Sequence, residues 1–228
     1  MAWADRLWNF GDPEQVRVPV AQLISNDHAQ ACAAKIKIAL RDEKPVQLDV
    51  EPSLAGGTVN LSATDRAGNM IAITLTHGGS YGARVAVPEL GLILGHGMSR
   101  FDPRPGRPNS PGPGKRPVNN MCPTIVTRNG APVLALGAAG GTRIPNSVYE
   151  VLVNHVGLGT GLAHAMAAPR LDCTGTLQLG LDKYHAPETE AFFKKVGYTV
   201  SRSPSAYVSA VAFDPATRKC QGIASGGA

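Results

Sequence analysis

Several features that mark common protein classes are missing from this chain of 228 residues. Aromatic residues make up only 5% of it. Its longest apolar runs, such as residues 131–139, are far shorter than the roughly 20 residues that a membrane-spanning helix needs. Residues 1–8 lack the basic start and apolar stretch of a signal peptide. We therefore expect no membrane span, coiled coil or collagen-like fibre.

Metal-binding motifs are also missing. The sequence has no Cys-x-x-Cys pair and no His-Glu-x-x-His motif, which argues against a structural zinc site, a thioredoxin-like centre and metal catalysis. Scattered cysteines commonly behave as small buried hydrophobic residues, although two disulfides remain open. The four cysteines are Cys32, Cys122, Cys173 and Cys220.

The composition is typical of a globular protein. Hydrophobic residues make up 43% and charged residues 17%, and 26 glycines with 18 prolines favour short strands joined by turns. The net charge of +5 arises within residues 100–128, which hold six basic residues against one acid. That segment is interleaved with proline and glycine, and its single aromatic, Phe101, makes no stacking platform. We interpret it as a solvated connector and expect no nucleic-acid partner.

Periodicity predicts the elements. Helical spacing indicates helices over 20–24 and 27–40, the second capped by Ser25 or Asn26. Residues 44–57 are polar and rich in turn formers, which predicts a linker between two parts, 1–57 and 58–228. From Thr58 onward, hydrophobic residues recur at every second position. Residues 58–64 and 70–76 alternate between apolar and polar side chains around a turn at 65–69, which predicts a β-hairpin.

The rest of the chain mixes strands and helices. We expect strands over 90–94, 124–128 and 132–136, an irregular segment over 103–117, helices over 144–156 and 160–167, and further elements over 177–181, 188–196, 199–202 and 207–213. Together these predict a layered α/β or α+β fold.

Two Gly-Gly pairs mark candidate sites of chemistry. Gly56 and Gly57 precede Thr58, where self-cleavage would free an α-amine with an unperturbed pKa of about 7.7–8, able to act as its own general base. Gly140 and Gly141 lie between a predicted strand and a predicted helix, where backbone N–H groups can hold an oxyanion. For Gly56 and Gly57, the alternative is an ordinary turn before a strand. For Gly140 and Gly141, the alternative is a glycine pair that only permits close packing.

Six motifs occur in order along the chain. They are Thr58-Val-Asn-Leu-Ser-Ala-Thr-Asp65, Asp65-Arg-Ala-Gly-Asn69, Gly114-Lys-Arg-Pro117, Met121-Cys-Pro-Thr-Ile-Val126, Gly140-Gly-Thr-Arg-Ile144 and Ala168-Pro-Arg170. Together they resemble the small subunit of the γ-glutamyltransferase family, whereas residues 1–57 resemble the tail of that family's large subunit. The resemblance implies an α+β N-terminal-nucleophile hydrolase with an αββα sandwich, here partial because most of the large subunit is not in this chain.

The resemblance also implies roles for individual residues. The chain would be cut autocatalytically before Thr58, which becomes the nucleophile, and Thr76 would hydrogen-bond to the hydroxyl of that nucleophile. Gly140 and Gly141 would bind the oxyanion. The implied reaction is acyl transfer or hydrolysis of γ-glutamyl amides such as glutathione, with no cofactor and no metal. The implied partners are a small amide substrate and the large-subunit region, and the implied location is periplasmic or extracellular.

The residues that would hold a γ-glutamyl group depart from the family pattern. Gly78 and Gly97 stand where polar side chains are usual, and Arg100 stands where an Asp holds the ammonium group of the substrate. Asn119 and Asn120 replace a pair of serines that the family has, and Asp102 is able to substitute for the missing Asp. The candidate substrate-binding residues are Arg100, Asp102, Asn119 and Asn120.

Three functions therefore remain open. The first is a γ-glutamyltransferase-like enzyme. The second is an amidase or acylase of the same family with a different acyl group. The third is a catalytically silent fragment that needs the missing N-terminal part.

Overall fold

A computed structural model describes residues 1–46, 57–203 and 205–225, which fold into two compact units. Unit 1 comprises residues 1–53, 97–119 and 173–203, and unit 2 comprises residues 54–96, 120–172 and 204–228. Residues 47–56 of the linker predicted over 44–57 lie outside the described residues.

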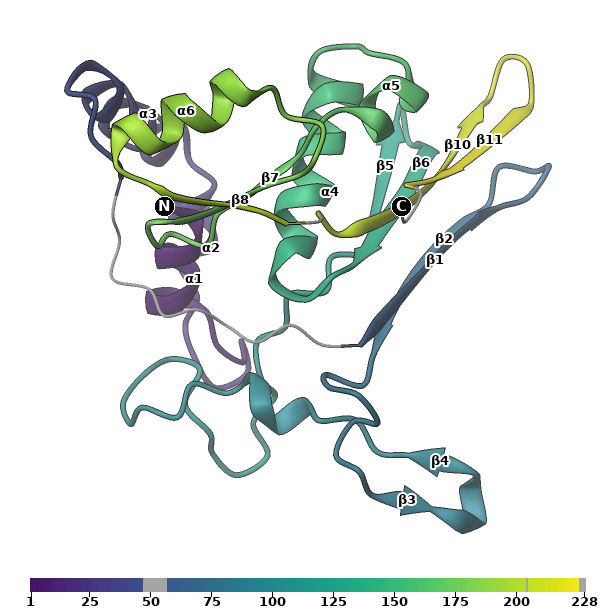
Figure 1. Ribbon diagram of the computed structural model, residues 1–228. Helices are drawn as coiled ribbons and strands as arrows, with labels where there is room; N and C mark the ends of the chain where they lie inside the picture. The colour runs from purple at the N-terminus through teal and green to yellow at the C-terminus, as the bar shows by residue number, and fades with distance from the viewer. Residues whose placement is uncertain (47–56, 204, 226–228) are drawn as a thin grey trace. The chain divides into compact units, whose positions relative to one another are not determined.

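Unit 2 is built on two antiparallel sheets. The larger sheet has the strand order β11-β10-β6-β5, and the smaller one is the β1-β2 hairpin. The hairpin packs on one face of the larger sheet, while helices α4 and α5 lie against the other face (Figure 1). The bounds of these elements are β1 Thr58–Thr64, β2 Met70–Thr76, β5 Thr124–Arg128, β6 Ala131–Ala139, β10 Tyr207–Asp214, β11 Lys219–Ala224, α4 Ile144–Leu152 and α5 Leu162–Ala167.

The hydrophobic core of unit 2 lies between the larger sheet and its helices. Alternate residues of β6, Leu134 and Leu136, are at most 1% exposed and pack with Val148 and Val151 of α4. Fully burying an aliphatic side chain of this size contributes about 1.5–3 kcal/mol. This core therefore fixes the larger sheet and α4 as one framework, from which the loop after β6 emerges.

The hairpin is confirmed, and its turn is fixed by Asp65. One carboxylate oxygen of Asp65 accepts the N–H groups of Ala67 (2.8 Å) and Asn69 (2.9 Å), and Gly68 supplies the required positive φ of 86°. The hydrogen bond from the Asn69 side chain, together with these backbone hydrogen bonds, lowers the pKa of Asp65. The turn sets a register in which Thr58 faces Thr76.

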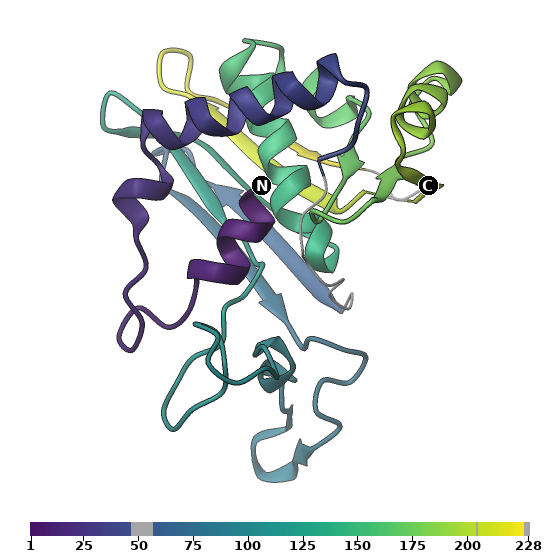
Figure 2. The same ribbon diagram turned by 90° about the vertical axis from the view of Figure 1, so that its left-hand side faces the viewer.

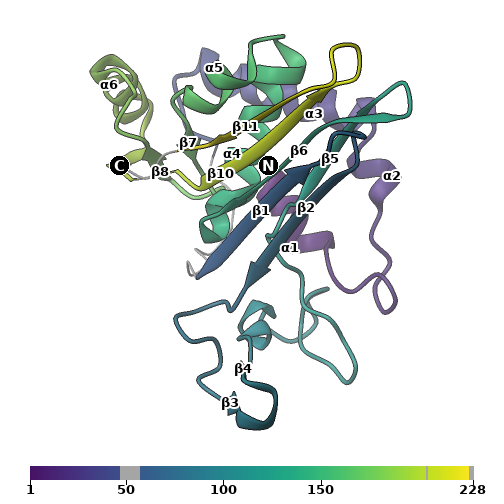
Figure 3. The same ribbon diagram turned by 90° about the vertical axis from the view of Figure 1, so that its right-hand side faces the viewer.

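The hairpin has an unusual distribution of polarity. Its polar residues, such as Asn60, Ser62 and Thr74, face the larger sheet, whereas most of its apolar residues point away from it. The outward side chains are Val59, Leu61, Ile71, Ile73 and Leu75, and they are 45–63% exposed. Figure 3 shows this hairpin lying along β10 and β6.

Unit 1 begins with three helices joined by loops (Figure 2): α1 Ala2–Asn9, α2 Val20–Leu23 and α3 Asn26–Arg41. Ser25 caps α3 by accepting the N–H of His28 at 3.2 Å, as predicted. Strands β8 Gln178–Leu181 and β9 Thr199–Arg202 pair in parallel around helix α6 Pro187–Val196. Residues 97–119 contain only the 3₁₀ turn η2 Gly97–Arg100 and are otherwise irregular, as the proline content predicts.

Some predictions of elements were incomplete. Helix α1 and strand β11 were missed. The strand expected over 90–94 is instead η1 Pro88–Leu90 followed by β4 Leu92–Ile93, because Gly91 takes a left-handed conformation (φ 61°). The helix expected over 144–156 ends as α4 at Leu152 and continues as a π-helix, η4 Val153–Gly157. The remaining elements are β3 Ala86–Val87, η3 Gly141–Arg143 and β7 Leu171–Asp172.

The four cysteines are free thiols, so neither possible disulfide forms. Within the described ranges, no helix has both the length and the apolar character that crossing a membrane requires.

Candidate active site

Two facing threonines form the centre of the candidate site. Thr58 begins β1 and Thr76 ends β2, and the Thr58 hydroxyl donates to the Thr76 hydroxyl at 2.9 Å. The Thr76 oxygen also accepts the N–H of Gly78 at 3.0 Å, and its own proton goes to the carbonyl of Gly57 at 2.9 Å. A hydroxyl has one donor and two acceptor positions, so Thr76 is fully used and both threonines are held in place.

The Gly57 carbonyl belongs to the peptide bond that joins Gly57 to Thr58. It accepts a second hydrogen bond, from the backbone N–H of His77 at 3.2 Å. Two donors on one carbonyl oxygen favour the build-up of negative charge on that oxygen. The arrangement therefore places the Thr58 hydroxyl beside a carbonyl that is polarised for attack.

A polar network between the two sheets supports this end of the hairpin. Asn60 accepts from Thr74 at 2.8 Å and donates to Ser209 of β10 at 2.6 Å. A Cβ at Gly137 of β6 would overlap the side chain of Asn60, so glycine is needed there for the sheets to approach. Sequence analysis missed Asn60, Thr74 and Ser209, although a polar face on an alternating strand was the available signal.

The same network sets the direction of the hairpin on the sheet. Asn60 meets Ser209 near the start of β10, and Gly68 in the turn contacts Phe213 near its end. Thr58 therefore lies toward the end of the sandwich where Tyr207 pairs with Ala139, the last residue of β6. The Gly140–Gly141 loop follows Ala139, so unit 2 brings the two threonines and this loop to one end of its sheets (Figure 3).

The glycines of this loop are required by its geometry. Gly140 has φ 154°, and a Cβ there would lie 2.7 Å from the Cβ of Ala206. Gly141 is buried with φ 65°. Arg143 donates its backbone N–H and its Nε to the Gly140 carbonyl at 3.3 and 3.2 Å. The buried Asn120 donates its side-chain amide to the Gly141 carbonyl. Both carbonyls are therefore anchored, which fixes the orientation of the loop.

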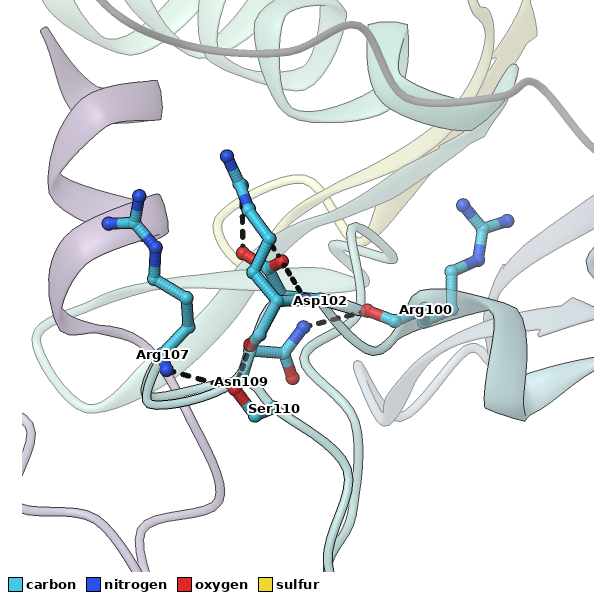
Figure 4. Close-up of polar contacts among 6 residues, drawn as sticks. Arg100, Asp102, Arg107, Asn109 and Ser110 are labelled. Atoms are coloured by element: carbon cyan, nitrogen blue, oxygen red, sulfur yellow. Dashed lines mark hydrogen bonds and ion pairs between the residues drawn. The ribbon is translucent and has the colours of Figure 1, made fainter.

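The other predicted substrate-binding residues belong to unit 1 (Figure 4). Asp102 is 7% exposed at its side chain, and Arg104 donates to both of its oxygens, at 2.9 and 2.8 Å. This ion pair holds the pKa of Asp102 below its ordinary value. Arg100 ends η2, and its backbone carbonyl accepts from Asn109 at 2.7 Å. Asn119 is exposed at the end of the same segment.

Gly78, a departure from the family pattern, has a structural reason. Its φ is 84°, and a Cβ would lie 3.2 Å from both the Cβ and the carbonyl oxygen of His96. Gly78 to Gly82 also match the spacing of a Gly-x-Ser-x-Gly nucleophile elbow around Ser80. That segment is a loop between β2 and β3 rather than a strand-to-helix turn, so it lacks the context of an elbow. Among the described residues, no group of three His, Cys, Asp or Glu side chains could hold a metal ion.

Known proteins match this chain over most of its length. The family model described as gamma-glutamyltranspeptidase matches residues 1–226. The chain is 34% identical to an acylase ACY 1 proenzyme from Pseudomonas sp. strain V22, over 94% of this chain and 38% of that protein. It is 32% identical to the glutathione hydrolase proenzyme of Escherichia coli K12, over 88% of this chain and 37% of that protein.

A solved structure resembles the chain as well. It is a gamma-glutamyltranspeptidase from Pseudomonas nitroreducens complexed with L-DON. Its TM-score is 0.65 at 28% identity, and the match covers 72% of this chain and 93% of that one. The fold is thus the α+β sandwich of N-terminal-nucleophile hydrolases, as predicted. The chain spans less than two fifths of the length of the two curated relatives named above.

Proposed function

Because this chain belongs to the γ-glutamyltranspeptidase family, we propose that it is the nucleophile-bearing part of an amide-cleaving enzyme that is activated by cleavage before Thr58. The observation that carries the proposal is the hydrogen-bond chain from the Thr58 hydroxyl through Thr76 to the Gly57 carbonyl. It joins a nucleophile, a positioning hydroxyl and the carbonyl to be attacked.

Maturation would proceed as an acyl shift followed by hydrolysis. The Thr58 oxygen attacks the carbonyl carbon of Gly57, and Thr76 and the His77 N–H stabilise the oxyanion that forms. The C–N bond then breaks, and the Thr58 nitrogen takes up the proton that the hydroxyl releases. Water hydrolyses the resulting ester, which leaves a carboxylate on Gly57 and a free α-amine on Thr58.

Turnover would use the same hydroxyl with its new base. The α-amine of Thr58, with an unperturbed pKa of about 7.7–8, accepts the hydroxyl proton as the oxygen attacks a substrate amide. Gly140 and Gly141 are proposed to hold the oxyanion through backbone N–H groups. The departing amine takes the proton, and water or an acceptor amine then cleaves the acyl ester, which gives hydrolysis or transfer.

Two substrate classes fit the proposed chemistry. γ-Glutamyl amides such as glutathione are suggested by the relatives named glutathione hydrolase. An acyl group without an α-amine is suggested by the relative named acylase and by Arg100, Gly78 and Gly97 at positions where the family has other residues. These three departures favour the acylase as the second candidate.

The proposed partner is a large-subunit-like region, in the same gene product or in a separate chain. The outward face of the β1–β2 hairpin supports this proposal, because five large apolar side chains there are 45–63% exposed. Contiguous apolar surfaces of this kind mark interaction sites. If no such partner exists, the silent-fragment hypothesis becomes the better one, and the gene sequence upstream of Met1 is the observation that decides between them.

Mass spectrometry of the protein produced together with its large-subunit region tests the proposed maturation. We expect a break between Gly57 and Thr58 in the wild type, none in Thr58→Ala, and cleavage retained in Thr58→Ser, which keeps a hydroxyl. Thr58→Ala should abolish turnover as well, because one hydroxyl serves both steps. A Thr58→Ala protein that still runs as two chains on a denaturing gel would remove Thr58 from the mechanism.

A further inference from the structure

The segment 97–119 of unit 1 is mostly irregular, so hydrogen bonds to one side chain, that of Asn109, do much to fix its shape. The Asn109 amide donates to the Arg100 carbonyl at 2.7 Å (Figure 4), and its side-chain oxygen accepts the N–H of Val118 at 2.9 Å. The backbone carbonyl of Asn109 accepts the N–H of Asp102 at 2.9 Å. One residue therefore joins the start of the segment to its end.

The turn that carries Asn109 is itself held from two sides. Within the turn, the Ser110 hydroxyl accepts the N–H of Arg107 at 2.9 Å. On its outer side, the Pro108 carbonyl packs so closely on the loop after α1 that a Cβ at Gly11 would lie 2.3 Å from the carbonyl oxygen. Asn109 is therefore a fixed point from which the neighbouring backbone is oriented.

The orientation of Arg100 depends on this fixed point. Arg100 ends the 3₁₀ turn η2, where carbonyl groups lack partners within the turn, and Asn109 supplies one. Together with the hydrogen bond to the Asp102 N–H, this contact holds the backbone on both sides of Phe101. Among the described residues, none hydrogen-bonds to the buried Nε of Arg100, and Figure 4 shows its guanidinium apart from the Asp102–Arg104 pair. The direction of the Arg100 side chain is therefore set mainly by its backbone.

We propose that Asn109 is a positioning residue that holds Arg100 in the orientation in which it selects the acyl group of the substrate. The inference rests on the proposed function, in which the Arg100 guanidinium disfavours an ammonium group. In this role Asn109 acts through the Arg100 backbone and takes no part in the chemistry. Loss of its amide leaves the charge of Arg100 in place but no longer holds that charge at one point, and the repulsion between like charges weakens as their distance grows.

A double-mutant cycle on the enzyme produced together with its large-subunit region tests this role. The variants are Asn109→Ala, Arg100→Gln and both together, and the quantity compared is the ratio of kcat/KM for glutaryl anilide to that for γ-glutamyl anilide. The control is Gln15→Ala, which removes an exposed hydrogen bond to the same segment, from the Gln15 side chain to the Pro113 carbonyl at 3.3 Å. If Asn109→Ala does not fold, Asn109→Gln, which displaces the same amide by one methylene, takes its place in the cycle.

We expect Asn109→Ala to lower this ratio by about threefold or more, mainly through a lower KM for the γ-glutamyl anilide and with little change in kcat. Gln15→Ala should keep the ratio of the wild type. In the Arg100→Gln background, Asn109→Ala should leave the ratio unchanged, because no guanidinium is left to position. A merely structural role of Asn109 would instead lower kcat/KM for both anilides by the same factor and leave the ratio where it was.

Two results would overturn the inference and leave the proposed function standing. One is a ratio that Arg100→Gln changes and Asn109→Ala does not. The other is a shift in Asn109→Ala that persists in the Arg100→Gln background or occurs equally in Gln15→Ala, because Asn109 would then not act through Arg100. A ratio that Arg100→Gln leaves unchanged would contradict acyl selection by Arg100 and the inference with it, and a wild type that cleaves neither anilide would contradict the proposed function as a whole.

Discussion

At the residue scale, the candidate site depends on hydrogen bonds that a sequence reveals only in part. The facing of Thr58 and Thr76 follows from the length of the turn at 65–69, so the pairing was predictable once the hairpin was recognised. The anchoring of Gly141 by Asn120 was not predictable, because it joins residues that are distant in sequence and depends on how β6 and its loop pack. Asn120 was expected to bind substrate, and that role stays a prediction.

The contact of Asn120 leads to a prediction about catalysis. In Asn120→Asp, a carboxylate replaces the donor that faces the Gly141 carbonyl, and the two oxygens repel. We expect kcat to fall by about 10²-fold, the usual cost of a misplaced oxyanion donor, with little change in KM. Asn129→Asp introduces the same charge in the exposed turn before β6, at the opposite end of that strand from the loop, and should leave kcat nearly unchanged.

Steady-state kinetics of the cleaved enzyme measures both variants. Equal kcat values for Asn120→Asp and Asn129→Asp would show that the anchor is not needed. Asn120→Ser adds no charge, and its shorter side chain cannot reach the Gly141 carbonyl. Comparing it with Asn120→Asp therefore separates the loss of this hydrogen bond from charge repulsion. Gly140→Val is a poorer probe of this loop, because its side chain would overlap Ala206 and disturb folding.

At the element scale, periodicity located the hairpin but could not say which of its faces is covered. Alternation predicts two faces, and the usual expectation is that the apolar face packs inward. Here the polar face packs on the larger sheet through Asn60 and Ser209, and the apolar face is exposed. Strand β11 was missed because its glycine and polar residues give no alternation, and it forms by pairing with β10.

The exposed hairpin face gives a prediction about assembly. Leu61 and Ile73 are cross-strand neighbours and are 56% and 48% exposed. Changing both to Thr should reduce aggregation of the chain alone and weaken its co-purification with a large-subunit-like partner, since burying each side chain is worth about 1.5–3 kcal/mol. Leu92→Thr on β4, 54% exposed and outside this face, is the control. Light scattering measures the aggregation of the double variant, the control and the wild type, and pull-down yields measure their co-purification with the partner. Undiminished co-purification of the double variant would contradict the proposed interface.

The loop after α1 gives a prediction about pH. Arg116 donates to both carboxylate oxygens of Asp12 and holds the pKa of that acid well below its ordinary value, near 3.9 for a free Asp. A lowered pKa means that the pair stabilises the fold above about pH 4 and that this contribution is lost as the pH falls below it.

Urea unfolding as a function of pH measures this contribution. We expect the wild type to lose stability as the pH drops from 5 toward 3, in the range set by the ordinary carboxyl pKa of about 3.9. Asp12→Asn should be less stable at pH 6 and should lose less on acidification. Glu89→Gln, which changes an exposed acid in η1, should follow the wild type. Parallel pH curves for Asp12→Asn and the wild type would count against the pair.

At the scale of the whole molecule, the family and the fold class were predictable because six ordered motifs carry them, whereas the division into two units was not. Each unit collects separate stretches of the chain: unit 1 joins residues 1–53 with 97–119 and 173–203. Such grouping depends on tertiary contacts like that of Asp12 with Arg116, which local patterns do not encode. The predicted boundary at Thr58 concerns maturation and stays a prediction.

The choice between γ-glutamyl and other acyl groups is the prediction that concerns the complete enzyme. Arg100 stands where the family has an Asp that holds the ammonium group of the substrate, and Asp102 is already paired with Arg104. A guanidinium would repel an ammonium group by about 1 kcal/mol or more at roughly 4 Å, so glutaryl amides should be cleaved at least as well as γ-glutamyl amides. Arg100→Asp should shift the preference toward the γ-glutamyl compound. The measurement compares the kcat/KM values of the wild type for γ-glutamyl and glutaryl anilides. A tenfold or greater preference for the γ-glutamyl anilide corresponds to about 1.4 kcal/mol in transition-state binding. Such a preference would mean that Arg100 does not select the acyl group.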